Sequence, residues 1–168
     1  MSEIPEIYLQ PGDWEVVLRP TVLKTVLGSC VGITFRVSRL GIGAMCHPML
    51  PHPAVRSRLH QGSATTGRYV DSIIGELASK LDRQGASRGE VEVKLFGGAD
   101  VLATARKAAS VGKMNADTAV RVLEEEGFRL AASCLGGSRG VFIEFHTATG
   151  EVLLRRLNNM DSASLART

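Results

Sequence analysis

The feature that most constrains the fold is a succession of four strand-like runs in the first third of the chain, separated by only a few residues each. Apolar and polar residues alternate in these runs, β-branched residues are enriched, and turn-forming residues stand between them, which is typical of β-strands. We expect strands at 14–18, 22–27, 31–37 and 42–46. Because strands that are adjacent in a sequence commonly pair antiparallel, a purely parallel, doubly wound sheet is not expected.

The middle of the chain changes to a helical pattern. Apolar residues between 69 and 81 fall on one face of a helix, which is expected to end near Gly85. The stretch "VEVKLFGGAD" then predicts a strand at 91–95 that stops at a Gly-Gly break. An Ala-rich helix is expected after this break, starting near Ala99 or Asp100.

The last part of the chain combines one more helix with three strands. A cap at Asn115 and a stop at Gly127 predict the helix. The segment 158–168 lacks a periodic apolar face and is interpreted as a flexible tail, so one mixed α/β domain is expected over 1–157. Strands are expected at 128–133, 141–145 and 151–157, with a hairpin turn, "TATG", at 147–150.

Composition and charge restrict the class of protein. The three cysteines, at 30, 46 and 134, contain no CxxC pair, so free thiols are expected rather than a disulfide framework or a structural zinc site. The N-terminus carries acids where a signal peptide is basic, and no apolar run is long enough to cross a bilayer, so we expect a cytoplasmic protein without membrane insertion. A net charge of +3 without a basic, aromatic cluster argues against nucleic acid as a partner.

Acidic residues are absent from Val16 to Val70, although several lysines and arginines fall in this window. Such a bias would attract an acidic partner and would favour a thiolate over a thiol at a cysteine within it. The alternative is that these basic side chains are scattered and solvated. The candidates for contact with an acidic partner are Arg36, Arg39, Arg56 and Arg58.

The stretch "TVLGSCVGITF" at 25–35 places a cysteine in an otherwise apolar strand pattern. Gly28 and Ser29 would let the chain turn sharply and bring backbone N–H groups close to the Cys30 sulfur, where they would stabilise an oxyanion. His47 ends a neighbouring predicted strand and would meet the sulfur if the two strands pair, with Thr25 as the candidate that orients the ring. The alternatives are a packed thiol, a loop histidine satisfied by backbone, and an ordinary β-forming threonine.

Two further patterns have competing interpretations. Cys46, His47, His52 and His60 could form a metal site, but their spacing matches no familiar ligand pattern and prolines stiffen the connection. The "FGGAD" stretch at 96–100 could hold a phosphate at a helix start, but two adjacent glycines do not make a nucleotide-binding fingerprint, and the pattern is more typical of a tight strand-to-helix turn. Cys46 and Cys134 are interpreted as core residues.

The pair "TVLGSCVGI" and "GIGAMCHPMLP" resembles the signature of the CheD chemoreceptor glutamine deamidases of bacterial chemotaxis. The resemblance continues through "GRYVD" at 67–71, "VKLFGGAD" at 93–100, "GKMN" at 112–115 and the region 135–157. It implies an α/β sandwich, with packed mixed or antiparallel β-sheets flanked by helices, of a cysteine-hydrolase type shared with deamidating bacterial toxins. Cys134 and Val141 depart from residues common at their positions in the family.

The resemblance implies that Cys30 is a nucleophile, His47 its base and Thr25 the third catalytic residue. The implied reaction converts glutamine side chains to glutamate on cytoplasmic helices of methyl-accepting receptors, releases ammonia and needs no cofactor; glutamate methyl esters are possible further substrates. The arginines named above would then face the receptor. A CheC-like phosphatase is the other implied partner, for which the chain would act as a regulatory binding module. An unrelated protein amide as substrate is a third interpretation.

Overall fold

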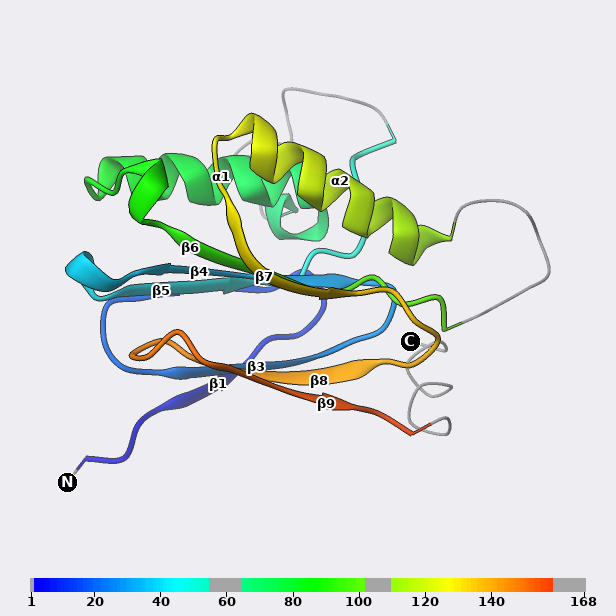
Figure 1. The fold of residues 1–168 in the computed structure, drawn as a ribbon, viewed down its shortest axis with the longest axis horizontal. Coiled ribbons are helices and arrows are strands. Elements are labelled where there is room, and N and C mark those ends of the chain that lie inside the picture. The colour runs from blue at the N-terminus through cyan, green and yellow to red at the C-terminus, as the bar shows by residue number, and fades with distance from the viewer. Residues whose placement is uncertain (1, 55–64, 102–109, 159–168) are drawn as a thin grey trace.

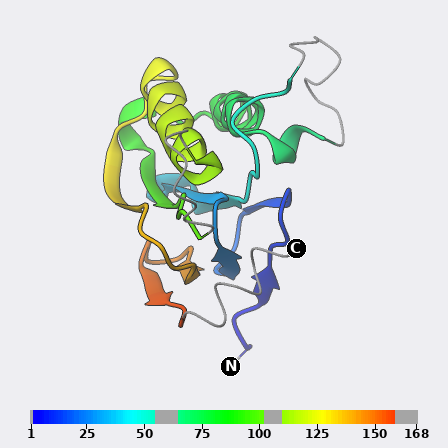
Figure 2. The same ribbon diagram turned by 90° about the vertical axis from the view of Figure 1, so that its right-hand side faces the viewer.

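The computed structural model describes residues 2–54, 65–101 and 110–158, and these form three layers (Figure 1). Helices α1 and α2 cover one face of a five-stranded sheet, and a four-stranded sheet packs against its other face, as the turned view also shows (Figure 2). The five-stranded sheet has the order β2-β5-β4-β6-β7, and the four-stranded sheet has the order β1-β3-β8-β9. The expected α/β sandwich of packed mixed sheets is confirmed.

The elements of the first half lie close to where the residue pattern predicts them. Three strands, β3, β4 and β5, have the predicted bounds. The first helix also ends where predicted, because Gly85 follows it with a positive φ of 83°. The short strand β1 was not predicted, because three residues carry too little alternation to be distinguished from a loop. The bounds are β1 Glu6–Tyr8, β2 Trp14–Val17, β3 Val22–Leu27, β4 Val31–Val37, β5 Ile42–Cys46 and α1 Val70–Arg83.

The second half requires two corrections. Helix α2 begins one turn earlier than predicted, because the Ser110 hydroxyl accepts a hydrogen bond from the Lys113 N–H, while Asn115 lies buried inside the helix. Ala99 and Asp100 are not helical, and most of the helix predicted there lies outside the described residues, as does most of the predicted tail. The bounds are β6 Glu92–Gly97, α2 Val111–Glu125, β7 Leu130–Leu135, β8 Val141–His146 and β9 Val152–Arg156.

Strands β3 and β4 are neighbours in the sequence but belong to different sheets. Strand β3 pairs with β8, whereas β4 pairs with β5 and β6. The chain therefore crosses from one sheet to the other within residues 28–30. Because a connection this short must turn sharply, it places Cys30 at the corner where the two sheets meet.

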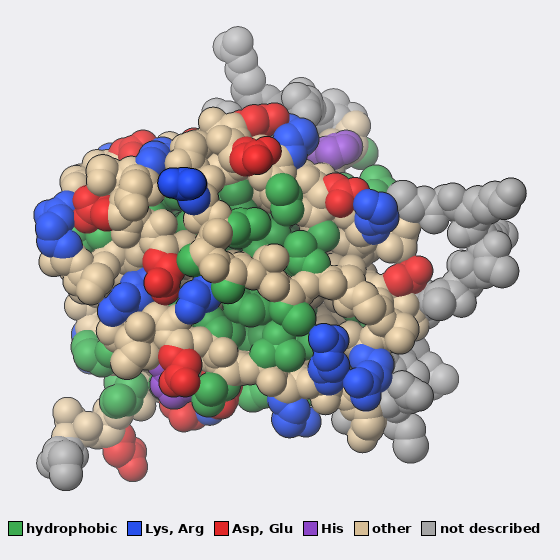
Figure 3. Space-filling model, viewed as in Figure 1, with side chains coloured by type: hydrophobic (Ala, Val, Ile, Leu, Met, Phe, Trp, Pro, Cys, Tyr) green, Lys and Arg blue, Asp and Glu red, His purple; other side chains and the backbone are tan. Residues whose placement is uncertain are grey.

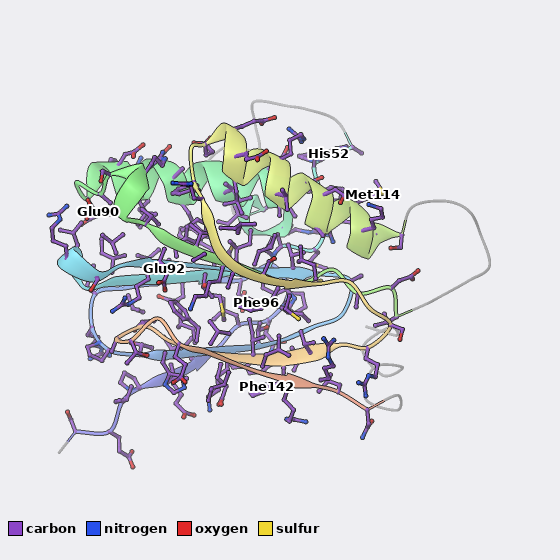
Figure 4. All side chains as sticks on the ribbon, viewed as in Figure 1. His52, Glu90, Glu92, Phe96, Met114 and Phe142 are labelled. Atoms are coloured by element: carbon purple, nitrogen blue, oxygen red, sulfur yellow. The ribbon has the colours of Figure 1, made fainter. Side chains whose placement is uncertain are left out.

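The two interfaces between layers form two separate apolar cores. The core between the helices and the five-stranded sheet takes alternate residues of β4, among them Ile33 and Phe35. The core between the sheets takes Leu23 and Leu27 of β3, together with Phe96, which Figure 4 shows between the sheets. Strand β4 is buried on both faces, which explains its nearly continuous apolar sequence.

One edge of the five-stranded sheet is uncovered. Its edge strand β7 is parallel to β6, carries no charged residue and is exposed along most of its length. Figure 3 shows hydrophobic side chains gathered in the middle of the side of the molecule that faces the viewer. Within the described ranges, no helix combines the length and the apolar character needed to cross a membrane.

Candidate active site

Thr25 and His47 meet between the two sheets, although they belong to different layers. The Thr25 Oγ1 lies 2.7 Å from the His47 Nδ1, and both side chains are buried. The same Oγ1 donates a hydrogen bond of 2.8 Å to the carbonyl oxygen of Leu9. The backbone of His47 is fixed as well, since its carbonyl accepts from the Gly12 N–H and its N–H donates to the Asp13 carbonyl, directly before β2.

This arrangement determines which nitrogen of the His47 ring carries the proton. A threonine hydroxyl has a single hydrogen, and the Leu9 carbonyl can only accept one. Both contacts of Thr25 therefore form together only when the His47 Nδ1–H donates to the Thr25 oxygen. The neutral ring then has an unprotonated Nε2, which is the nitrogen that a general base requires.

Cys30 faces the same space between the sheets as His47. It packs against the inter-sheet core and is half-buried. The pairing of Ile33 with Cys46 and the hydrogen bond of 3.3 Å from the Val31 N–H to the Pro48 carbonyl bring its segment beside the one that carries His47. Diagonal neighbours on one face of a sheet lie about 7 to 8 Å apart at their Cα atoms, which is within reach of longer side chains.

The turn that carries Cys30 is held by its carbonyl groups. The Gly28 carbonyl accepts from the Ala99 N–H at 3.0 Å, and the Cys30 carbonyl accepts from the Gly98 N–H at 2.9 Å. In the described part of the chain, the N–H groups of Ser29 and Cys30 have no hydrogen-bond acceptor other than the Cys30 sulfur itself. The "FGGAD" stretch thus holds the turn at Cys30 in place, and it uses the N–H groups of Gly98 and Ala99 for these two bonds.

Burial keeps both the thiol and the imidazole uncharged. It raises the pKa of the Cys30 thiol to about 11, although the backbone N–H of the same residue acts in the opposite direction. It lowers the pKa of His47 to about 4, against the effects of the Leu9 carbonyl and of the Asp13 carboxylate. The expectation that basic residues keep Cys30 as a thiolate is therefore not met in the free protein.

The two described arginine candidates lie away from this site. Arg36 is five residues beyond Val31 on β4, about 16 Å along an extended strand, and its guanidinium donates to the carbonyls of Thr147 and Ala148. Arg39 pairs with Glu90, which Figure 4 places at the opposite end of the molecule from Met114. The other two candidates, at positions 56 and 58, lie outside the described residues.

The residues of the alternative metal site are not brought together. Cys46 is fully buried on the helix side of β5, whereas His47 points to the inter-sheet side. The His52 Nδ1 lies 3.1 Å from the Pro53 carbonyl, and position 60 is outside the described residues. Cys134 is half-buried, and the described residues contain no group of three or more metal-ligating side chains.

Two contributors to the site were missed at the sequence level. The Leu9 carbonyl acts through the backbone, which leaves no signal in residue type. The Asn115 side chain donates to the carbonyls of Ser29 and Met49, next to Cys30 and His47. The "GKMN" motif was the available signal, but a helix cap was the local interpretation of its asparagine.

Comparison with known proteins connects this geometry to one family. A family model described as CheD chemotactic sensory transduction matches residues 49–156. A Geobacter sulfurreducens protein named probable chemoreceptor glutamine deamidase CheD 2 is 40% identical over 162 residues, which cover 96% of each chain. The Maridesulfovibrio salexigens protein named probable chemoreceptor glutamine deamidase CheD is 36% identical over 160 residues, covering 93% of this chain and 94% of its own.

The similarity extends to a more distant source and, weakly, to a solved structure. A Thermococcus kodakarensis protein, also named probable chemoreceptor glutamine deamidase CheD, is 34% identical over 156 residues, covering 92% of this chain and 94% of its own. The crystal structure of the Bacillus licheniformis hypothetical protein YfiH has a TM-score of 0.43 and 11% identity, over 75% of this chain and 50% of that one. This second likeness is too slight to inform the fold.

Proposed function

The chain belongs to the CheD family, and we propose that Cys30, His47 and Thr25 catalyse the deamidation for which its relatives are named. The protein is a chemoreceptor glutamine deamidase, an amidohydrolase of chemotaxis. The observation that carries the assignment of residues is the Thr25–His47 contact of 2.7 Å beside Cys30 at the inter-sheet corner. It supplies a base of defined tautomer on a segment that runs beside the one carrying the half-buried thiol of Cys30.

In the proposed first half-reaction, the His47 Nε2 removes the thiol proton of Cys30 as the sulfur attacks the carboxamide carbon of the substrate glutamine. The C–S bond forms, and the carbonyl π electrons move to the oxygen. The imidazolium then protonates the amide nitrogen, the C–N bond breaks, and ammonia leaves behind a thioester.

In the second half-reaction, the now neutral ring removes a proton from water, which attacks the thioester carbonyl. The C–S bond breaks, the proton returns from His47 to the sulfur, and the product is the glutamate side chain. No metal or organic cofactor is part of these steps. The same acyl chemistry would release methanol from a glutamate methyl ester, which makes methylesterase activity a second possible reaction of the site.

The backbone at the sheet corner is suited to stabilise the tetrahedral oxyanion. The Gly28 carbonyl points toward the turn after β6, so the Ser29 N–H of the same trans peptide points away from that turn, and the Ser29 and Cys30 N–H groups are the proposed donors for an oxyanion near the sulfur. Gly28 allows the sharp turn between the sheets, and Ser29 contributes its backbone. We therefore assign oxyanion binding to main-chain groups of 29 and 30.

In the absence of substrate the Cys30 thiol and the His47 ring are both neutral, so the free enzyme does not hold a thiolate–imidazolium pair. The pKa of the Cys30 thiol, about 11, lies well above that of His47, about 4, so proton transfer between them alone is unfavourable. Transfer becomes favourable only together with attack, when the negative charge passes to an oxyanion held by N–H groups. Such a thiol is protected from oxidation until a receptor occupies the site.

The assignment is tested with purified protein and a cytoplasmic receptor fragment. Peptide mass spectrometry measures the conversion of each receptor glutamine to glutamate for the wild type, Cys30→Ala and His47→Ala. Both variants are expected to lose activity by at least roughly 100-fold. Cys30→Ala should keep the wild-type unfolding temperature within a few degrees, whereas His47→Ala should lower it, because it removes a buried, hydrogen-bonded ring. Retained conversion by folded Cys30→Ala would refute the nucleophile assignment.

Binding of a CheC-like phosphatase remains a separate prediction. If the chain also acts as a regulatory binding module, Cys30→Ala is expected to bind the phosphatase with unchanged affinity, because the substitution removes only one sulfur. Calorimetric titration of both forms with the phosphatase measures this. Absence of any binding would leave deamidation as the sole activity supported.

A further inference from the structure

The motif "GKMN" at 112–115 lies where helix α2 touches the turn after β6, and the mechanism above does not use it. A Cβ on Gly112 would meet the backbone of Gly98 and Ala99, so only glycine permits this close approach. Asn115 follows three residues later and therefore projects from the same face of the helix. Its side chain is completely buried there.

The Asn115 side chain connects the two segments that carry the proposed catalytic pair. Its Nδ2 donates to the carbonyl oxygen of Ser29, one residue before Cys30, at 2.9 Å. It also donates, at 2.9 Å, to the carbonyl oxygen of Met49, two residues after His47. One amide group thus fixes the position of one segment relative to the other.

The oxygen of the Asn115 amide makes no hydrogen bond to the residues that the structure describes, which indicates that the two bonds donated by its nitrogen are the reason for an asparagine at this position. The Asn115 Oδ1 is buried and has no hydrogen-bond partner within the described part of the chain. Burying an unpaired oxygen is unfavourable, and an apolar side chain of similar size would avoid that penalty. Because both partners are carbonyl oxygens, only the nitrogen of the amide can face them.

We propose that Asn115 is a positioning residue for deamidation, which holds the Cys30 turn and the segment after His47 at the separation that proton transfer requires. This inference rests on the proposed function. A sulfur and a base on separate segments must approach within hydrogen-bond distance during attack, and a misplacement of about 1 Å can lower the rate by roughly 100-fold. The restraint comes from α2, outside both sheets.

The test is the isosteric variant Asn115→Asp. A carboxylate would place two acceptors against two carbonyl oxygens, so the segments should move apart. We expect kcat on the receptor fragment to fall by roughly 100-fold at pH 7, with KM changed by less than about threefold. Burial beside carbonyls raises the pKa of such a carboxyl, so kcat relative to the wild type should recover as the pH falls toward 5 and one donor returns.

A second measurement separates positioning from loss of structure. Alkylation of Cys30 by iodoacetamide needs the thiolate but not the geometry relative to His47, so its rate in Asn115→Asp should fall much less than kcat does. The matched control is Ser110→Ala, which removes the cap of the same helix and leaves both Asn115 bonds in place. It should lower the unfolding temperature and keep the wild-type kcat.

The outcomes distinguish this inference from the assignment on which it rests. Wild-type kcat in Asn115→Asp, with an inactive Cys30→Ala, overturns the role of Asn115 and leaves the proposed function intact. An equal loss of kcat in Asn115→Asp and in Ser110→Ala overturns it as well, because stability alone would then account for the effect. An active Cys30→Ala refutes the proposed function itself.

Discussion

At the scale of single residues, the site depends on one buried hydroxyl with two different partners. Thr25 accepts from His47 and donates to Leu9, and these bonds give the ring the tautomer that a base requires. Its place on the strand that leads to Cys30 makes this threonine a candidate, but its residue type alone indicates only a β-former. The bond to a ring in the other sheet is a tertiary property.

Replacing Thr25 tests the role of this hydroxyl. Thr25→Val keeps the shape of the side chain but removes the oxygen that accepts from the His47 Nδ1–H and the hydroxyl that donates to the Leu9 carbonyl. We expect kcat to fall by roughly 100-fold and the free energy of unfolding to fall by about 1 to 3 kcal/mol. Thr25→Ser retains the hydroxyl and should keep most of the activity; equal activity of the two variants would contradict the orienting role.

The pH dependence of alkylation tests the neutral resting state of the site. Since burial raises the pKa of Cys30 to about 11, the iodoacetamide rate at this residue should rise continuously from pH 7 to pH 10. A thiolate–imidazolium pair would instead give a plateau through neutral pH. The rate is followed on the Cys30 peptide by mass spectrometry, which separates it from alkylation of the other two cysteines.

Burial of His47 also predicts acid sensitivity of the fold. Its pKa is lowered from 6.5 to about 4, so the unfolded chain takes up this proton at higher pH than the folded protein. The stability that it contributes is complete above pH 6.5 and declines as the pH falls toward 4, by about 3 kcal/mol. Urea unfolding at pH 7 and pH 4.5 should show a smaller decline for His47→Gln than for the wild type.

At the scale of elements, local patterns located β3, β4 and β5 to the residue, but they did not indicate which sheet each joins. Alternation is a local property, whereas the choice of partner depends on packing between distant segments. The start of α2 was wrong for a related reason. Asn115 is a good cap residue, but its side chain bonds to two loops far away in the sequence, and Ser110 takes the cap.

Two helical glycines provide a matched pair that tests how closely α2 must approach the turn after β6. A Cβ on Gly112 would meet the backbone of that turn, whereas one on Gly75 of α1 would meet nothing within 4 Å. Gly112→Ala should therefore lower the free energy of unfolding by about 1 to 3 kcal/mol, whereas Gly75→Ala should raise it by about 0.5 to 1 kcal/mol. Urea unfolding measures both, and equal effects would contradict this packing.

At the scale of the whole molecule, the two described arginine candidates of the acid-free window, Arg36 and Arg39, lie away from the site. Arg36 is tied to the β8–β9 turn, and Arg39 to Glu90 at the far end. Basic side chains near the candidate site can attract an acidic receptor helix over about 8 to 10 Å at moderate ionic strength. Arg56 and Arg58 remain candidates on sequence alone.

Charge reversal distinguishes the two groups of arginines. At low ionic strength, Arg56→Glu or Arg58→Glu is expected to raise KM for the receptor fragment more than it lowers kcat, and added salt should reduce the difference. Arg39→Glu serves as the control, with KM near that of the wild type, because its pairing places it away from Cys30. Identical KM values for all three variants at low salt would reject steering by 56 and 58.

The sequence by itself located most of the strands and the first helix and made Cys30 and His47 candidates for catalysis, because periodicity, turn residues and side-chain type are local. Only the tertiary structure decided that the chain changes sheets at Gly28–Cys30, that Thr25 meets His47, and that Asn115 joins their segments. It also decided that the thiol and the ring are neutral. Burial and hydrogen bonds between distant segments set these properties, and neither exists until the layers pack.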